Sequence, residues 1–252
     1  MLELYGHCAL IIFCYMTAVF CLALYKKDNS IVDVAWGIGY ILITWYSLVK
    51  IGLYQPLHML ITVLVTVWGT RLSWHIYLRN KNKPEDPRYA AWRKAWKWVK
   101  LRSFFQVFML QGLILLIIAY PVIFIQSSKN APLDLFAYLG TGIWVFGLLF
   151  ESIGDWQLKV FLNNPKNKGK IMQNGLWRYT RHPNYFGESV MWWGIFIICF
   201  GLPCGWTTIV SPLLLTYLLV YVSGVPMAEK FFEGNKEFEE YKKKTSAFLP
   251  WF

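Results

Sequence analysis

The sequence predicts an all-α membrane protein with seven transmembrane helices, its N-terminus outside and its C-terminus in the cytoplasm. The composition is the first observation, since 56% of the 252 residues are hydrophobic and 15% are charged, against about 25% charged residues in soluble domains. The second is a series of seven apolar runs near the ~20 residues that cross a bilayer. The third is a net charge of +11 that is concentrated in alternate loops. Soluble, disordered and collagen-like chains are excluded.

The predicted spans follow one another along the chain without a repeat or a low-complexity tract, so we expect one domain over residues 1–252. Residues 133–252 are expected to be its motif-rich C-terminal part. No basic segment precedes the first span, which is therefore expected to be a membrane helix and not a cleaved signal peptide. Residues 201–205 alone separate the last two spans, which predicts a tight helical hairpin. The spans are predicted at Tyr5–Leu24, Ile31–Val49, Leu57–Leu78, Phe104–Ile125, Leu133–Ile153, Tyr185–Phe200 and Trp206–Gly224.

The positive charges predict the direction of the spans. All of the 25 Lys and Arg residues except Lys50, Arg71 and Lys129 lie in four segments, which follow the first, third, fifth and seventh spans. Positive loops face the cytoplasm. We expect a monomer in a bacterial inner membrane, which the lack of a targeting signal favours over the endoplasmic reticulum of a eukaryote. The four segments are Lys26–Lys27, Arg79–Arg102, Lys159–Arg181 and Lys230–Lys244.

A basic and aromatic segment follows the third span. Trp92, Trp96 and Val99 recur at helical spacing opposite a positively charged face, which predicts one amphipathic helix lying in the membrane interface. We therefore expect lipid and no nucleic acid as its partner. The five cysteines show no CxxC or Cys/His ligand spacing, so no metal site is predicted.

Polar residues inside the spans gather toward the predicted cytoplasmic side. Such residues are costly in lipid and indicate a functional site, although snorkelling or a structural pair such as Asp33 with Arg71 is an alternative for any one of them. The pattern predicts a polar cavity open to the cytoplasm and an apolar outer half, in which His58 is expected alone at the interface; a channel or pump is disfavoured. The residues are Asp33, Arg71, His75, Gln106, Gln111, Glu151, Asp155, Asn184 and Glu188.

The loop before the sixth span combines cations with motif residues. Arginine and lysine bind phosphate groups, and Pro183 can begin a helix whose free N–H groups face an anion. A patch on anionic lipid is the alternative, but it does not require His182, Asn184, Tyr185 or Glu188. No Walker A motif is present, and Gly140-Thr-Gly142 in an apolar span is typical of helix packing. The cations are Lys166, Lys168, Lys170, Arg178 and Arg181.

Five motifs identify the chain as resembling the DUF1295 family, which is similar to the C-terminal domain of steroid 5-alpha-reductases and, more distantly, to sterol reductases. The resemblance implies an NADPH-dependent oxidoreductase acting on CH–CH groups. Its substrate would be a hydrophobic enone, steroid-like or isoprenoid, that enters from the bilayer, and its cofactor would lie in the cytoplasm-facing cavity. The motifs are Asn29-Ser-Ile-Val-Asp-Val-Ala-Trp-Gly37, Trp68-Gly-Thr-Arg-Leu72, Glu85-Asp-Pro-Arg-Tyr89, Arg181-His-Pro-Asn-Tyr-Phe-Gly-Glu188 and Thr245-Ser-Ala-Phe-Leu-Pro-Trp251.

The resemblance also implies roles for single residues. In the reductases an acidic residue and a tyrosine polarise the enone oxygen; the counterparts here are Asp33 and Trp68, and indole has no acidic proton. Then either His75, which needs only a small environmental shift to act near neutral pH, or Tyr185 takes the acid role, with Arg71 in the same catalytic group, or the substrate is not a steroid enone. The implied cofactor-binding residues, with Lys168 added for its charge, are Asp155, Lys168, Arg178, Arg181, His182, Asn184, Tyr185, Glu188 and Glu229.

Two other functions remain open. The segment Arg181–Gly187 followed by a glutamate-containing tail also resembles membrane methyltransferases of the isoprenylcysteine and phospholipid type, which use S-adenosylmethionine. Their tail has paired acids where this chain has Ala228-Glu229, and its cations suit a phosphate-rich dinucleotide better. A non-enzymatic lipid-binding membrane protein is the third possibility.

Overall fold

The computed structural model describes residues 1–251, which form helices and no strand. Six helical stretches in this part of the chain are long and apolar enough to cross a membrane, and the prediction of an all-α, multi-pass membrane protein is confirmed. The predicted sixth span forms a helix of 18 residues that is not among the six, because its first turns carry Asn184 and Glu188. The count of seven and the direction of insertion stay predictions.

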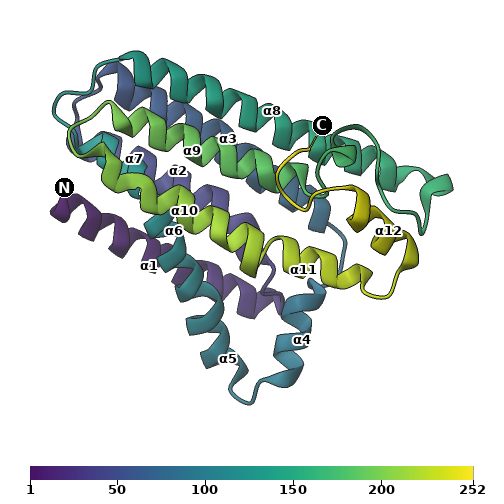
Figure 1. The fold of residues 1–252 in the computed structure, drawn as a ribbon. Helices are drawn as coiled ribbons and strands as arrows, with labels where there is room; N and C mark the ends of the chain where they lie inside the picture. Colours follow the sequence, from purple (N-terminus) through teal and green to yellow (C-terminus); the bar gives the residue numbers. More distant parts are fainter. Residues whose placement is uncertain (252) are drawn as a thin grey trace. The chain divides into compact units, whose positions relative to one another are not determined.

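The helices divide into two compact units, residues 1–133 and residues from Asp134 onward (Figure 1). The helices of the N-terminal unit are α1 (Leu2–Lys26), α2 (Ile31–Ile51), α3 (Pro56–Asn80), α4 (Pro87–Ala95), α5 (Val99–Arg102), the π-helical η1 (Ser103–Met109), α6 (Leu110–Ile118) and α7 (Tyr120–Ser127). Those of the C-terminal unit are α8 (Leu135–Asn163), η2 (Pro165–Asn167), η3 (Gly175–Arg178), α9 (Pro183–Phe200), η4 (Gly205–Ile209), α10 (Val210–Tyr217), η5 (Leu218–Val222), α11 (Val225–Glu229), η6 (Lys230–Phe232) and α12 (Lys236–Lys244).

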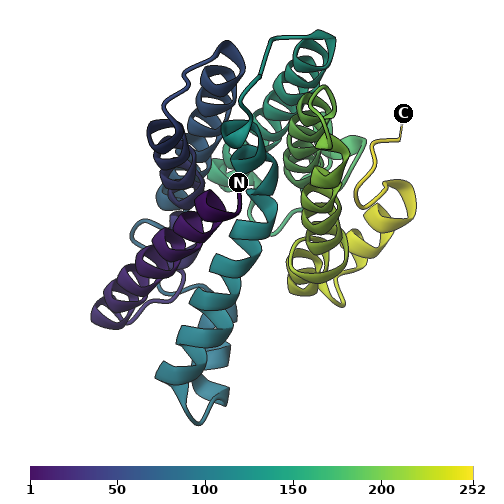
Figure 2. The same cartoon turned by 90° about the vertical axis from the view of Figure 1, so that its left-hand side faces the viewer.

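In the N-terminal unit, α2 and α3 pack closely because glycines face each other. A Cβ atom on Gly37 would lie 2.2 Å from the carbonyl oxygen of Gly69, so only hydrogen fits at this contact. One turn away, the Ser73 hydroxyl donates a hydrogen bond to the Val34 carbonyl (2.9 Å). The Gly37–Gly69 and Ser73–Val34 contacts fix the register of α2 on α3. Helix α1, purple in Figure 2, packs against α2 and against η1 and α6, which are teal.

Two predicted helices of this unit have different bounds in the structure. The helix predicted over Trp92–Val99 is wrong: α4 ends at Ala95, Trp96 is extended (φ −89°, ψ 133°), and the Trp92 and Trp96 rings stack with centroids 5.6 Å apart. The predicted span Phe104–Ile125 is interrupted at Ala119, between α6 and α7. Pro121 occupies the first turn of α7, where its missing N–H costs nothing.

The end of this unit opposite Asp33 is more polar than predicted. His58 is fully buried (0% exposed), and the expectation that it lies alone at the interface is wrong. Its Nδ1 accepts from the Gln55 backbone N–H (3.3 Å) and its Nε2 lies 3.0 Å from the Ser128 carbonyl. The buried Gln126 amide donates to the Thr62 hydroxyl (2.9 Å). These groups join the start of α3 to α7, a structural role that one span alone does not reveal.

In the C-terminal unit, α8 and α9 run side by side (Figure 1). Glycines set the distance between the two helices. A Cβ atom on Gly147 would lie 2.6 Å from the Gly187 carbonyl oxygen, and a Cβ atom on Gly140 would lie 2.5 Å from the Gly194 carbonyl oxygen. Gly140 therefore packs helices, as the sequence predicts. At the far end, Gly154 contacts Pro183, which brings the polar end of α8 to the first turn of α9.

Candidate functional site

The N-terminal unit holds a polar cluster at the start of α2. The Asp33 carboxylate accepts hydrogen bonds from the Tyr89 hydroxyl (2.6 Å) and from Arg88 Nη2 (3.1 Å). Arg88 is itself held by Asp86, whose carboxylate accepts from its Nε at 2.9 Å. The Gln111 amide donates to the Tyr89 oxygen (3.2 Å), and Trp36 Nε1 donates to the other end of that amide. The cluster therefore fixes one phenol between a carboxylate and an amide.

Tyr89 lies on α4, outside the predicted spans, and is 3% exposed. Burial, together with the negative charge of Asp33, raises the pKa of its phenol well above the ordinary value. The hydroxyl therefore keeps its single proton at neutral pH and donates it to the Asp33 carboxylate in this arrangement. Tyr89 belongs to the motif Glu85–Tyr89, which carries the family resemblance but which we did not assign to the site. Its role becomes visible only when α4 folds against α2.

Arg71 and His75 lie one turn apart on α3, and both side chains are half-buried with partners in the described chain. The contacts of Gly37 with Gly69 and of Ser73 with Val34 place their turns of α3 beside the first turns of α2. Trp68, the counterpart of the reductase tyrosine, is buried against Tyr40 with ring centroids 5.3 Å apart. The phenol that contacts Asp33 is therefore that of Tyr89 on α4, and not one at the position of Trp68 on α3.

The C-terminal unit builds its polar cluster from the loop before α9 and the tail of the chain. The Arg181 backbone N–H donates to the Ser246 carbonyl (2.9 Å) and the Thr180 hydroxyl donates to the Phe248 carbonyl (2.9 Å). The Tyr241 hydroxyl donates to the Trp177 carbonyl. Burial raises the pKa of this phenol, which keeps the donor protonated. The tail therefore lies along the loop.

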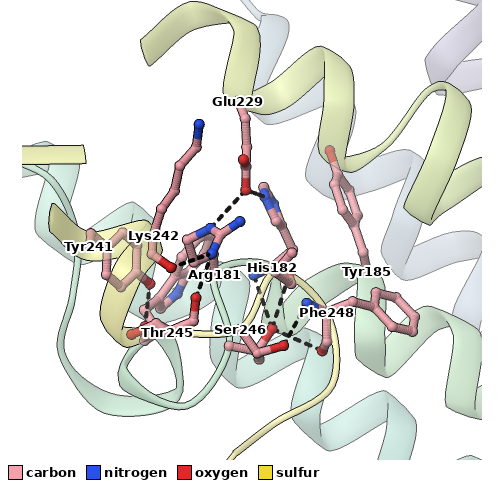
Figure 3. Close-up of polar contacts among 12 residues, drawn as sticks. Arg181, His182, Tyr185, Glu229, Tyr241, Lys242, Thr245, Ser246 and Phe248 are labelled. Carbon is pink, nitrogen blue, oxygen red and sulfur yellow. Dashed lines mark hydrogen bonds and ion pairs between the residues drawn. The ribbon is translucent and has the colours of Figure 1, made fainter. Parts of the chain in front are cut away.

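Arg181, His182 and Glu229 meet at the start of α9 (Figure 3). Glu229 Oε1 accepts from Arg181 Nε (2.8 Å) and lies 3.1 Å from His182 Nε2. Arg181 Nη1 also donates to the backbone carbonyls of Thr245 and Lys242. The His182 and Tyr185 rings stack with centroids 5.2 Å apart and planes 8° apart. These contacts bring four of the predicted cofactor residues together and use most of the Arg181 guanidinium within the chain.

The remaining acidic and amide residues follow from the α8–α9 register. A Cβ atom on Gly187 would lie 2.5 Å from the Glu151 backbone nitrogen. A Cβ atom on Gly154 would lie 3.4 Å from the Asn184 backbone nitrogen. Asp155, 7% exposed, therefore lies beside the first turn of α9, and Glu188 is one turn further along. The structure brings the predicted residues of α8 and α9 to one end of the helix pair.

The lysine loop and Arg178 lie at the surface. The side chains of four cations are exposed and form no hydrogen bond or ion pair within the described residues. They are Lys166, Lys168, Lys170 and Arg178. Because no carboxylate neutralises these four cations, they fit a polyanionic cofactor. The structure does not join Lys168 to the Arg181–Glu229 cluster.

Comparison with known proteins gives the family. The family model "Protein of unknown function (DUF1295)" matches residues 19–245, so the chain belongs to the DUF1295 family, and the recognition made from its motifs is confirmed. No solved structure matches the chain significantly.

Three curated relatives are similar to parts of the chain. The steroid enzyme 3-oxo-5-alpha-steroid 4-dehydrogenase 1 of Bos taurus is 28% identical over 113 residues, 44% of this chain and 40% of its own length. A probable O-methyltransferase of Ustilaginoidea virens, ustE, is 39% identical over 70 residues, 27% of this chain and 25% of its own. An uncharacterized protein of Schizosaccharomyces pombe is 23% identical over 204 residues, which cover 69% of this chain and 58% of that protein. The matches span less than two thirds of each relative.

Proposed function

We propose that this protein is a membrane-embedded reductase that uses NADPH to reduce the C=C bond of a lipid enone. The observation that carries the proposal is the presence of two features in one chain: a protonated phenol held by Asp33, and exposed cations without a carboxylate partner among the described residues, in the loop that leads to Arg181. The partial similarity to a steroid 4-dehydrogenase supports the same reaction class.

The C-terminal unit would hold the cofactor. The exposed Arg178 and Lys168 would bind its phosphates, since both are free of carboxylate partners. Arg181 would act mainly through Glu229 and the tail, keeping His182 and Tyr185 in a stacked pair at the first turn of α9. Asp155, Asn184 and Glu188 would contribute the polar groups beside that turn. NADPH supplies a hydride for the β-carbon of the enone.

The N-terminal unit would activate the substrate. An enone gains negative charge on its oxygen as hydride adds, and a positioned donor stabilises that charge. The Tyr89 hydroxyl would take this role by turning its single O–H from Asp33 to the enone oxygen, while Gln111 continues to donate to the phenol oxygen and the raised pKa keeps the phenol protonated. His75 and Tyr185 remain the other candidates for the donor, with Arg71 in the same group as His75.

Ligand-dependent stability tests the proposal directly. A ligand that binds only the folded protein stabilises it by about 2.7 kcal/mol at 100 times its dissociation constant. We expect NADPH to raise the unfolding temperature of the detergent-purified protein and S-adenosylmethionine to leave it unchanged. Oxidation of NADPH on addition of a lipid enone would then establish turnover. Stabilisation by S-adenosylmethionine alone would reject the reductase.

The methyltransferase is the second candidate, because the short ustE match has the higher identity. It predicts methyl transfer from S-adenosylmethionine to a lipid acceptor and no oxidation of NADPH. A non-enzymatic lipid-binding protein would bind lipid and be stabilised by neither cofactor. The one set of measurements therefore distinguishes all three functions.

A further inference from the structure

A pocket of about 310 Å³ opens in the C-terminal unit between the end of α8 and the loop that follows it. Its apolar wall includes Trp156, Val160 and Phe161, which lie on the last turns of α8. Helix α8 has 29 residues, a length of about 43 Å, and the hydrocarbon core of a bilayer is about 30 Å thick. Helix α8 is therefore longer than the core is thick. Its last turns carry Lys159 and lead into the lysine loop, so we expect them outside the core, where a water-soluble ligand can enter the pocket.

Most of the other residues that line the pocket carry side-chain amides. Gln157 Oε1 accepts a hydrogen bond from the Leu176 backbone N–H (2.9 Å). Asn164 Oδ1 accepts one from the Lys166 backbone N–H (3.0 Å). Asn167 Nδ2 donates one to the Phe161 carbonyl (3.0 Å). Each of these bonds uses one end of its amide. The other ends, together with the whole Asn174 amide, form no hydrogen bond within the described residues. The amides that line the pocket thus carry both donors and acceptors that the described residues leave unused.

We propose that this pocket binds the adenine base of a nucleotide. A flat heteroaromatic ring fits between aromatic and apolar side chains, and its edge requires a mixed set of donors and acceptors such as the free amide ends supply. No charged side chain lines the pocket, as suits a neutral base. Lys166 and Lys168 adjoin the lining residue Asn167 in the chain, where they can meet the phosphates of the same ligand.

The loop that borders the pocket leads along the chain to the cluster described above. The amide of Gln157 binds Leu176, and the next residue, Trp177, donates its indole N–H to the Gly154 carbonyl (3.0 Å). The loop then continues into Arg181 and α9. The inference rests on the proposed function only in that the cofactor contains adenosine, which is true of NADPH and also of S-adenosylmethionine. The two proposals can therefore fail separately.

Binding of ADP, AMP and reduced nicotinamide mononucleotide to the detergent-purified full chain, measured by titration calorimetry, tests the pocket. We expect ADP and AMP to bind, and Trp156→Ala to weaken ADP binding about fivefold or more through loss of stacking. Asn174→Ala should weaken it about threefold or more through loss of an amide contact. Neither change should affect the mononucleotide, which has no adenine.

Two matched variants control for general effects. Trp206→Ala removes a similarly exposed tryptophan, 65% against 63% for Trp156, and Asn163→Ala removes an exposed asparagine that does not line the pocket. Both should bind ADP as the unaltered protein does. Failure of the unaltered protein to bind any adenine nucleotide would overturn the inference, as would equal losses in pocket and control variants. Binding of S-adenosylhomocysteine but not NADPH, weakened by Trp156→Ala, would reject the reductase and support the pocket.

Discussion

Glu229 connects three separate parts of the C-terminal unit through a single carboxylate. It lies at the end of α11 and pairs with Arg181 and His182 at the start of α9, while Arg181 reaches the tail through the Thr245 carbonyl. The side chains of Arg181 and Glu229 are 10% and 14% exposed. At this degree of burial each charge depends on the other, because water cannot replace the lost partner.

We therefore expect Glu229→Gln to lower the free energy of unfolding by up to about 3 kcal/mol, since it leaves the Arg181 charge uncompensated. The measurement is thermal or denaturant unfolding in detergent, together with the rate at which a protease removes the tail. Glu240→Gln is the control, because Glu240 is exposed on α12 and has no ion-pair partner among the described residues. Equal stability of the two variants would show that the pair contributes nothing.

Tyr89 carries the second prediction at this scale. Tyr89→Phe keeps the ring and removes the hydroxyl that binds Asp33 and Gln111. If this hydroxyl is the donor to the enone oxygen, turnover should fall by about 10²–10⁴-fold, with NADPH affinity unchanged. Turnover kinetics and NADPH titration measure the two effects. Tyr25→Phe, at a tyrosine that is 85% exposed, is the control; full activity of Tyr89→Phe would direct attention to His75 or Tyr185.

At the scale of elements, the α8–α9 pair determines where the predicted cofactor residues lie. Glycines let the two backbones approach along their length, and this contact brings Asp155 to the first turn of α9. A Cβ atom on Gly187 would meet only backbone atoms, the Glu151 nitrogen at 2.5 Å and the Gly147 oxygen at 2.6 Å. Backbone atoms cannot move aside as a flexible side chain can, so the helices themselves would have to separate.

Gly187→Ala should therefore destabilise the protein by about 3 kcal/mol or more and weaken NADPH binding. Gly142→Ala on α8 is the matched control, because nothing lies within 4 Å of the added Cβ atom; its stability should be unchanged or slightly higher. Thermal unfolding in detergent with and without NADPH gives both results. A stable Gly187→Ala variant would show that α8 and α9 do not pack this closely.

Sequence patterns predict these elements unevenly. Apolar length predicts α1, α2 and α3 to within a few residues, because a helix must satisfy its own backbone in lipid. Helical periodicity predicts a continuous helix from Trp92 to Val99, and this prediction is wrong. The chain leaves the helix at Trp96, whose ring stacks on that of Trp92. Hydrophobicity likewise misses the break at Ala119, since apolar residues continue on both sides of it. Local backbone geometry decides both positions, and ring stacking accompanies the first of them. Composition describes neither.

At the scale of the whole molecule, the distribution of the +11 charge predicts on which side each loop lies. The lysine loop and α12 should both face the cytoplasm, and the loop at Cys204 should face the other side. Cys204 is exposed and provides a natural probe. A maleimide that cannot cross membranes should label it in intact cells, whereas Lys168→Cys and Lys243→Cys, introduced without Cys204, should react only after the membrane is opened. The reverse pattern would invert the topology.

The sequence by itself determines the membrane class, the positions of α1, α2 and α3 and the family, because these depend on apolar length, charge and motif residues that can be read one segment at a time. It places the start of α8 but not its end, which lies at Asn163 and not at Ile153. Tertiary structure alone decides that Tyr89 meets Asp33, that the tail holds Arg181 through Glu229 and Thr245, and that His58 is buried in a polar network. Each of these contacts joins residues 47 or more positions apart. Local patterns carry no information on such pairs, since packing of whole helices brings them together.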